Sequence, residues 1–260
     1  MEQILKTIPN IPKQDVVPSY DKLIELRVEA YNSIEGELKG YNCSQCLNKG
    51  YIAKISNGCE VMAECKCMKI RTTLKRIKQS GLEQQLKACT FKNFQTESEW
   101  QLHIKTAAAE FVKSSSIGFF IGGQSGCGKT HICTAIVGNF IKQGLSARYF
   151  VWRDDSTVLK AMVNEREYTE RMDEFKKADV LYIDDLFKQT VVKDADIKLA
   201  FELIDYRLRK QLRTIISTEL DENFLIELDE GLGSRIMEIS RGFRIIVARD
   251  RTRNYRLRKE

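Results

Sequence analysis

Residues 123–130 read Gly-Gln-Ser-Gly-Cys-Gly-Lys-Thr, and this octapeptide decides the fold of the chain. It fits the pattern G-x-x-x-x-G-K-[ST], in the context that the pattern requires: the apolar run 117–121 precedes it and a helical pattern over 130–143 follows it. Glycines let the backbone turn tightly and aim its N–H groups at phosphate oxygens, and the start of a helix adds its positive end. The octapeptide therefore predicts a phosphate-binding loop.

The loop is expected to bind ATP and magnesium. Lys129 is expected to reach the β- and γ-phosphates, and the Thr130 hydroxyl to be a magnesium ligand. The predicted nucleotide-binding residues of this segment are Gly123, Gln124, Ser125, Gly126, Cys127, Gly128, Lys129, Thr130 and His131.

An acidic pair follows about 55 residues later, at the end of the sequence VLYIDD (180–185). Four apolar residues predict a buried strand, and ligands of open α/β sheets lie at the carboxyl ends of the strands. Asp184 is expected to hold magnesium through water, and Asp185 to orient or activate the water that attacks the γ-phosphate.

Short apolar runs alternate with helical patterns after Trp100. Strands are predicted at 117–121, 147–151, 180–183, 214–217 and 243–247, and helices at 101–113, 130–143, in two pieces within 156–177, at 194–211 and at 233–240. This alternation predicts an α/β fold with a parallel five-stranded sheet covered on both faces.

Five segments together resemble the DnaC/DnaI-type helicase loaders, which are AAA+ ATPases of the DnaA-related clade. They are IGGQSGCGKTH (121–131), VLYIDDLF (180–187), IISTEL (215–220), GLGSRI (231–236) and NYR (254–256), within about residues 91–258. The resemblance implies a P-loop AAA+ ATPase that loads the hexameric replicative DNA helicase onto single-stranded DNA during replication initiation, encoded by a bacterium or a phage. The chain ends four residues after Arg256, which agrees with the absence of a C-terminal helical lid in these loaders.

The resemblance also implies residue roles. Arg235 matches the arginine finger that enters the ATP site of a neighbouring subunit in a homo-oligomeric ring or spiral, with Arg241 as the alternative. A residue that senses the γ-phosphate is expected at Thr218 or Glu219, and Arg256 is expected to contact phosphate within its own subunit.

A DNA-contacting surface is implied for residues 156–177, where the resembling proteins line a channel for single-stranded DNA. The cations of this segment are Lys160, Arg166, Arg171, Lys176 and Lys177. Acidic residues are interleaved with them, so a solvated charged helix is the alternative interpretation.

Five of the eight cysteines fall between residues 43 and 67. Cys43-x2-Cys46 and Cys65-x-Cys67 are separated by eighteen residues, a spacing that predicts a structural four-thiolate zinc site at Cys43, Cys46, Cys65 and Cys67. Cys59 is the competing ligand. In the resembling loaders an N-terminal zinc-containing domain binds the helicase, so residues 1–90 are expected to form that domain and residues 91–260 the ATPase domain.

Composition and charge agree with this organisation. Hydrophobic residues make up 43% and charged residues 30% of 260 residues, which excludes a largely disordered chain, and no apolar run approaches the roughly 20 residues of a membrane span. We expect a cytoplasmic protein. Residues 241–260 carry eight basic and two acidic side chains, which indicates either a polyanionic partner or ligand, or a solvated charged terminus.

Two other functions remain open from the sequence. An IstB-like transposition ATPase shares the ATPase core and would bind duplex DNA and a transposase. An adaptor or helicase inhibitor would bind nucleotide without turning it over. The sequence does not separate these functions from helicase loading.

Overall fold

The computed structural model describes residues 18–79, 83–188 and 191–257, and the chain divides into two compact units, residues 1–75 and 76–260. The domain boundary predicted after residue 90 stays a prediction. Part of the basic segment 241–260, namely residues 258–260, lies outside the described residues.

The described residues of the first unit form one helix and one hairpin, followed by a helix that begins in this unit and ends in the second. These are α2 (Tyr20–Ser33), β1 (Tyr51–Ser56), β2 (Cys59–Glu64) and α3 (Cys67–Gln79). Ser19 caps α2 by accepting a hydrogen bond from the Lys22 amide at 3.3 Å. β1 and β2 are antiparallel, and Asn57 and Gly58 between them have φ of 51° and 72°, as a two-residue hairpin turn requires.

The second unit alternates helices and strands. Its elements are α4 (Glu83–Ala88), α5 (Glu99–Lys113), β3 (Gly118–Gly123), α6 (Lys129–Lys142), β4 (Ala147–Val151), α7 (Trp152–Ala161), α8 (Arg166–Lys176), β5 (Val180–Leu186), α9 (Asp194–Arg209), β6 (Arg213–Thr218), α10 (Glu222–Leu228), α11 (Glu230–Ile239) and β7 (Arg244–Val247), followed by two 3-10 turns, η1 (Arg251–Arg253) and η2 (Tyr255–Leu257).

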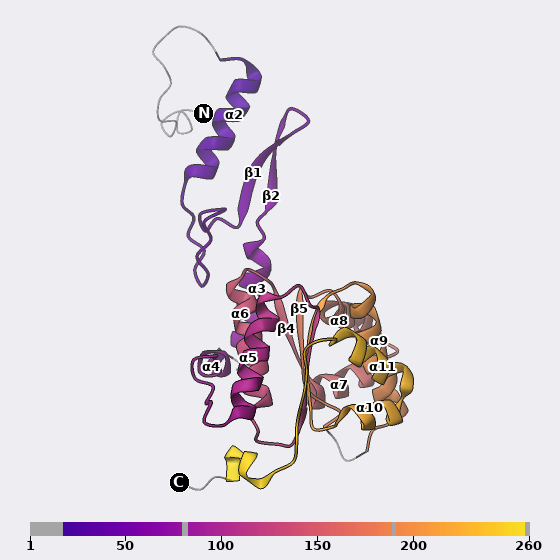
Figure 1. The fold of residues 1–260 in the computed structure, drawn as a ribbon. Coiled ribbons are helices and arrows are strands. Elements are labelled where there is room, and N and C mark those ends of the chain that lie inside the picture. Colours follow the sequence, from indigo (N-terminus) through magenta and orange to yellow (C-terminus); the bar gives the residue numbers. More distant parts are fainter. Residues whose placement is uncertain (1–17, 80–82, 189–190, 258–260) are drawn as a thin grey trace. The chain divides into compact units, whose positions relative to one another are not determined.

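The five strands form one parallel sheet in the order β4-β5-β6-β3-β7. Helices α5 and α6 cover one face, and α7, α8, α9 and α11 cover the other (Figure 1). The fold class predicted from the sequence is confirmed. The order places β6 between β3 and β5, so the strand that leads to the phosphate loop and the strand that carries the acidic pair are not neighbours.

Two apolar layers fill the space between the sheet and the helices. On the α5–α6 side, the Phe111 ring packs against Phe119 and Phe140, with ring centroids 5.5 and 5.7 Å apart. On the other side, a larger buried cluster includes Phe150, Trp152 and the apolar side chains of α9 and α11. Strands buried on both faces read as continuous apolar runs. No helix in the described ranges is long and apolar enough to cross a bilayer.

Two differences from the predicted helices concern α2 and α10. The helical pattern of residues 19–38 extends past the end of α2 at Ser33, and α10 has no counterpart among the predicted helices. α10 has seven residues, too few for a helical period to stand out, although Asp221 caps it by accepting from the Phe224 amide at 2.9 Å.

Candidate functional site

The phosphate-binding loop connects β3 to α6 and depends on left-handed backbone at three glycines. Gly123, Gly126 and Gly128 have φ of 131°, 77° and 92°. A Cβ at Gly126 would lie 1.9 Å from Oδ1 of Asn254, so close approach as well as conformation requires glycine there. Cys127 is buried, and its thiol donates to the Gln124 carbonyl at 3.0 Å.

Lys129 and Thr130 open α6. The Lys129 ammonium is buried and donates to the carbonyls of Gly123 and Gln124, at 2.7 and 2.8 Å. The Thr130 hydroxyl donates to Oδ1 of Asp184 at 3.2 Å. The structure therefore brings the predicted loop and the predicted acidic strand together.

Asp184 is held by three hydroxyl groups. Its Oδ1 accepts hydrogen bonds from Thr130, from Tyr182 at 2.5 Å and from Ser217 at 2.9 Å. Ser217 lies on β6, and its hydroxyl also accepts from the Asp185 amide at 3.0 Å. Burial raises the pKa of Tyr182 well above its ordinary value, so this hydroxyl stays protonated and donating. Sequence reasoning missed both Tyr182 and Ser217 as partners of Asp184. Ser217 has no signal in the sequence, because only the position of β6 next to β5 brings it to Asp184.

Asp185 and Glu219 are bridged by a lysine that sequence reasoning also missed. The ammonium of Lys188 lies 2.7 Å from Oδ2 of Asp185 and 3.2 Å from Oε1 of Glu219. Thr218, the other candidate sensing residue, is fully buried, and its hydroxyl donates to the Leu186 carbonyl at 2.8 Å. Of these two candidates, Glu219 lines the cavity described next.

Two adjoining cavities flank the phosphate loop. The first, of about 220 Å³, is lined by Ser125, Gly126, Gly128, Lys129, Thr130, His131, Asp185, Lys188, Glu219, Tyr255 and Arg256. The second, of about 320 Å³, shares part of the loop, His131 and Tyr255 with the first and adds the Phe94 ring and the Gln101 amide. The His131 ring packs edge-on against Phe94 with centroids 5.4 Å apart, and its Nε2 lies 3.0 Å from the Thr90 carbonyl.

The C-terminal segment 250–256 braces the loop. The Gln124 side-chain amide exchanges two hydrogen bonds of 2.7 Å with the backbone of Asp250, and the Tyr255 amide donates to the Gly126 carbonyl at 3.0 Å. Arg256 donates to the Ser125 hydroxyl at 3.0 Å. Arg256 therefore lies at the loop, and its contact with phosphate stays a prediction.

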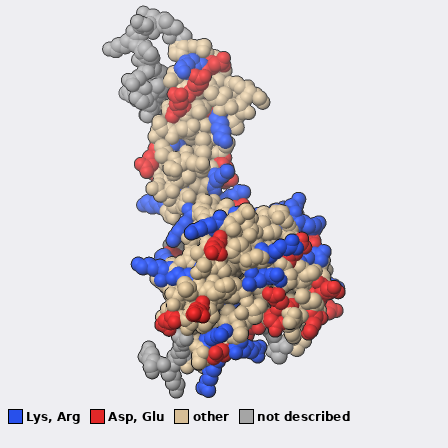
Figure 2. Space-filling view, in the orientation of Figure 1, with Lys and Arg blue, Asp and Glu red and all other residues tan. Residues whose placement is uncertain are grey.

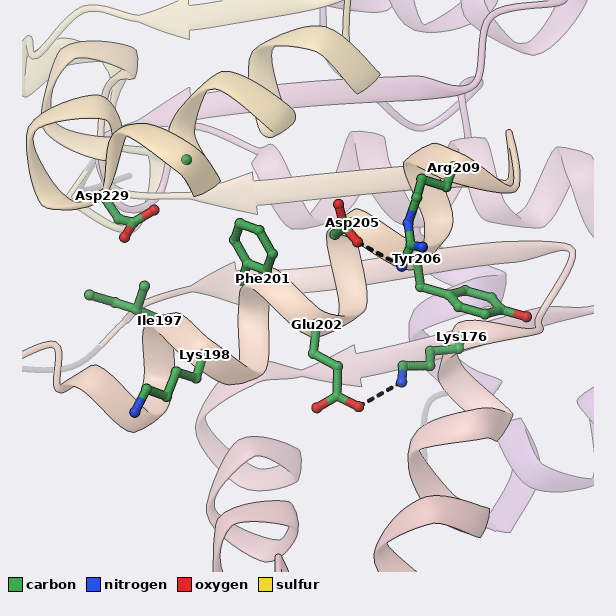
Figure 3. A pocket seen from close by; sticks show the side chains of 10 residues that line it. Lys176, Ile197, Lys198, Phe201, Glu202, Asp205, Tyr206, Arg209 and Asp229 are labelled. Carbon is green, nitrogen blue, oxygen red and sulfur yellow. Dashed lines mark hydrogen bonds and ion pairs between the residues drawn. The ribbon is translucent and has the colours of Figure 1, made fainter.

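Arg235, on α11, is not among the residues that line either of these cavities. Its guanidinium donates to Oδ1 of Asp205 and to the Gly231 carbonyl, at 2.8 and 2.9 Å, and lies 4.4 Å from the centre of the Phe201 ring. Phe201, Asp205 and Gly231 line a separate cavity of about 630 Å³ beside α9, where Asp205 also pairs with Arg209 (Figure 3). The alternative finger, Arg241, is exposed.

All five cations proposed as DNA contacts have carboxylate partners. Lys160 pairs with Asp196, Arg166 with Glu170, Arg171 with Asp155, Lys176 with Glu202 and Lys177 with Asp173. Figure 2 shows basic and acidic side chains close together over much of the displayed face, with acidic side chains gathered over α10 and α11. Residues 221–239 contain six acidic residues and one basic residue, so this surface is unsuited to nucleic acid.

The four predicted zinc ligands meet in the first unit. The sulfur atoms of Cys43, Cys46, Cys65 and Cys67 all lie within 4.8 Å of one another, and the four residues are buried. Arg71 of α3 secures the segment before them by donating to the carbonyls of Lys39 and Tyr41, at 2.7 and 2.6 Å. Cys59 is exposed and pairs with Ser56 beside the hairpin turn, outside this group.

The donor set of the cysteine cluster fits zinc. Four sulfur atoms at this separation match the tetrahedral thiolate coordination of structural zinc sites. Burial raises the pKa of Cys67 to about 12, so the four thiols do not all ionise at neutral pH unless a cation compensates their charge. The Gly50 amide donates to the Cys46 sulfur at 3.2 Å, which is typical support for a metal-bound thiolate.

The sequence profile of the IstB-like ATP binding proteins matches residues 61–229. Two relatives come from Bacillus subtilis (strain 168). The uncharacterized protein YqaM is 32% identical over 75% of this chain and 66% of its own length, and the phage-like element PBSX protein XkdC is 30% identical over 82% of this chain and 85% of its own length. The replicative helicase loader DnaC of Escherichia coli (strain K12) is 25% identical over 67% of this chain and 71% of its own length.

Solved structures agree on the fold. The crystal structure of DnaI superimposes with a TM-score of 0.54 at 20% identity and covers 64% of this chain and 93% of its own. The crystal structure of the DnaC helicase loader gives the same TM-score and identity over 64% of this chain and 99% of its own.

Proposed function

We propose that this chain, which belongs to the family of IstB-like ATP binding proteins and has a DnaC-type AAA+ domain, is an ATPase that loads a replicative DNA helicase onto single-stranded DNA. The observation that carries the ATPase part is the 3.2 Å contact between the Thr130 hydroxyl and Asp184 at the edge of a cavity formed by the phosphate loop. The helicase part is supported by the similarity to loaders of that class.

The 220 Å³ cavity is the proposed site of the triphosphate. Loop amides and Lys129 bind the phosphate oxygens, and Thr130 and Asp184 supply the oxygen ligands that magnesium prefers. Magnesium, when bound, neutralises charge that develops on the phosphates. Asp185 orients a water molecule, whose oxygen bonds to the γ-phosphorus as the bond to the β–γ bridging oxygen breaks, so that ADP and phosphate leave.

The 320 Å³ cavity is the proposed site of the nucleobase. It adjoins the glycines of the loop, and the rings of Phe94 and Tyr255 offer apolar faces for a planar base. The Gln101 amide, which donates to the Tyr255 hydroxyl, supplies a polar group that can orient the base.

The first unit is proposed to hold zinc and to bind the helicase. Its hairpin exposes Tyr51, Ile55, Val61 and Met62, each 44–47% accessible, and few apolar side chains are buried among the described residues of this unit. Exposed apolar side chains on neighbouring strands are typical of protein–protein contacts. Zinc at Cys43, Cys46, Cys65 and Cys67 would fix the hairpin relative to α3.

DNA binding is proposed for the basic C-terminal segment together with Lys160, Arg166, Arg171, Lys176 and Lys177. Five of these cations are already paired with carboxylates, so phosphates of the DNA must compete with those pairs, and binding should weaken steeply with salt. Assembly of several chains on the DNA, with Arg235 entering the ATP site of a neighbour, is part of the same proposal.

Transposition is the second candidate, because the matched family profile is that of IstB-like proteins. Purification of the full chain from its native cell, with its partners identified, separates the candidates. A replicative helicase supports loading, whereas a transposase without a helicase supports the second candidate.

A measurement of ATP hydrolysis distinguishes a loader from an adaptor or inhibitor that only binds nucleotide. We expect phosphate release that single-stranded DNA stimulates, and its loss in a Lys129→Ala variant because the phosphates lose a buried cation. A Lys142→Ala variant is the matched control, since α6 places this exposed lysine about 20 Å from Lys129. Nucleotide binding without phosphate release would support the adaptor instead.

A further inference from the structure

Lys188 occupies the wall of the triphosphate cavity that Asp185 and Glu219 also form. Its ammonium bridges the two carboxylates, at 2.7 Å from Asp185 and 3.2 Å from Glu219. The side chains of Lys188, Asp185 and Glu219 are 39%, 24% and 34% accessible, respectively. The bridge is therefore partly exposed to solvent. A partly exposed cation thus lies beside the carboxylate proposed to orient water.

The backbone that carries Lys188 is strained. Asp185 and Phe187 have φ of 54° and 59°, in the left-handed region that non-glycine residues rarely adopt, and the register of β5 against β6 shifts between Ile183 and Leu186. The Lys188 amide closes the turn by donating to the Asp185 carbonyl at 2.9 Å. Strain of this kind clusters at functional sites. The turn brings the Lys188 side chain back over Asp185.

The wall of the cavity carries carboxylates, so a bound triphosphate needs a cation in addition to Lys129. Magnesium would compensate the charge of Asp184, whereas Asp185 and Glu219 line the space proposed for the γ-phosphate and repel a phosphate group. Lys129 donates to two carbonyls of the loop itself. Burial acts to lower the pKa of Lys188, but the hydrogen bonds and charges of Asp185 and Glu219 outweigh it and raise that pKa. Burial likewise acts to raise the pKa of Glu219, whereas the hydrogen bond from Lys188 is the largest contribution that lowers it.

We propose that Lys188 is a ligand of the γ-phosphate, and that Asp185 and Glu219 hold its ammonium in place until a nucleoside triphosphate binds. When the γ-phosphate arrives, the ammonium turns from Asp185 to the phosphate oxygens, and Asp185 becomes free to accept a hydrogen bond from water. A diphosphate does not reach Lys188, so the bridge stays closed. Lys188 and Glu219 thus distinguish the triphosphate from the diphosphate. This inference rests on the proposed function and extends it.

Calorimetric titration of the full chain with magnesium and either ADP or a non-hydrolysable ATP analogue tests the proposal. We expect Lys188→Ala to weaken binding of the analogue by about ten- to a hundredfold, the value of a charge-assisted contact, and to leave ADP affinity unchanged. Glu219→Gln should strengthen binding of the analogue, because one of the two carboxylates that hold Lys188 loses its charge. Lys188→Arg should retain most of the preference for the analogue, and Lys142→Ala should match the wild type.

Two results overturn the proposal. One is wild-type affinity for both the analogue and ADP in Lys188→Ala, which would make Lys188 only an ion-pair partner of Asp185. The other is an equal loss of both affinities, which would make its role structural. If the wild-type protein binds neither nucleotide, the proposed function itself fails, so the two failures are distinct.

Discussion

The guanidinium of Arg235 donates to Asp205 at 2.8 Å within the same chain, although the resemblance assigns Arg235 to the ATP site of a neighbour. This hydrogen bond is the largest of the interactions that lower the pKa of Asp205, so the pair persists at neutral pH. To act as the proposed finger, Arg235 must leave Asp205, the Gly231 carbonyl and the Phe201 ring.

We predict that Arg235→Ala lowers the rate of ATP hydrolysis by the DNA-assembled protein on the order of a thousandfold, because a finger arginine stabilises transition-state charge. Nucleotide affinity of the isolated chain should not change. Arg209→Ala, which removes the other cation paired with Asp205, is the matched control. Mixing Arg235→Ala with Lys129→Ala should restore activity, since one supplies an intact site and the other an intact finger. No restoration would contradict a finger acting between subunits.

Ser217 should control the response to magnesium. Ser217→Ala removes a donor to Asp184 and the acceptor for the Asp185 amide, so we expect a higher magnesium concentration for half-maximal hydrolysis and a loss of about 1–3 kcal/mol of stability. Tyr182→Phe removes a donor to Asp184 but leaves that acceptor in place, and should change the magnesium response with a smaller effect on unfolding. Magnesium titrations of hydrolysis and denaturant unfolding measure the two effects. An unaltered magnesium response in both variants would refute the positioning role.

Removal of zinc should unfold the first unit alone. We expect about one zinc per chain by elemental analysis, and loss of this metal in Cys65→Ser, because three thiolates no longer close the tetrahedral site. Hydrogen exchange should then rise in β1 and β2 but not in β3–β7. Cys59→Ser is the control and should keep the metal, since Cys59 lies outside the cluster. A metal content near zero in the wild-type protein with slow exchange in the hairpin would contradict the zinc site.

Arg207 should stabilise the second unit more than any surface arginine. It is fully buried on α9, and its guanidinium donates to the Thr214 hydroxyl and to the carbonyls of Phe175, Lys176, Ala178 and Arg213. Burial lowers its pKa to about 9, so it remains charged at neutral pH.

Arg207→Met should destabilise the protein by about 3–5 kcal/mol in denaturant unfolding, since each buried acceptor left without a donor costs about 1–3 kcal/mol. Arg207→Lys should recover little, because a single ammonium cannot span the carbonyls that the planar guanidinium reaches. Arg209→Met, on the exposed side of the same helix, should have almost no effect. Equal stability of the Arg207 and Arg209 variants would contradict this role.

The sequence by itself determined those features that depend on short-range patterns. The glycines before Lys129 predict a phosphate loop because few other sequences let a strand turn into a helix there. The spacing of the four cysteines predicts a metal site, because thiolates at such spacings can bind one metal ion. Apolar runs that are separated by segments of helical periodicity predict the parallel sheet. The family resemblance added Arg256, which lies at the loop.

Only the tertiary structure decided which of these segments meet. The position of β6 between β3 and β5 brings Ser217 to Asp184 and Glu219 to Lys188, and neither relation has a signal in residue spacing. The burial of Arg207 and the pairing of Arg235 with Asp205 likewise depend on how α8, α9 and α11 pack. The physical reason is the distance along the sequence over which the deciding interactions act. A local pattern fixes backbone conformation over a few residues, whereas strand order and side-chain partners follow from the packing of the whole chain into one core.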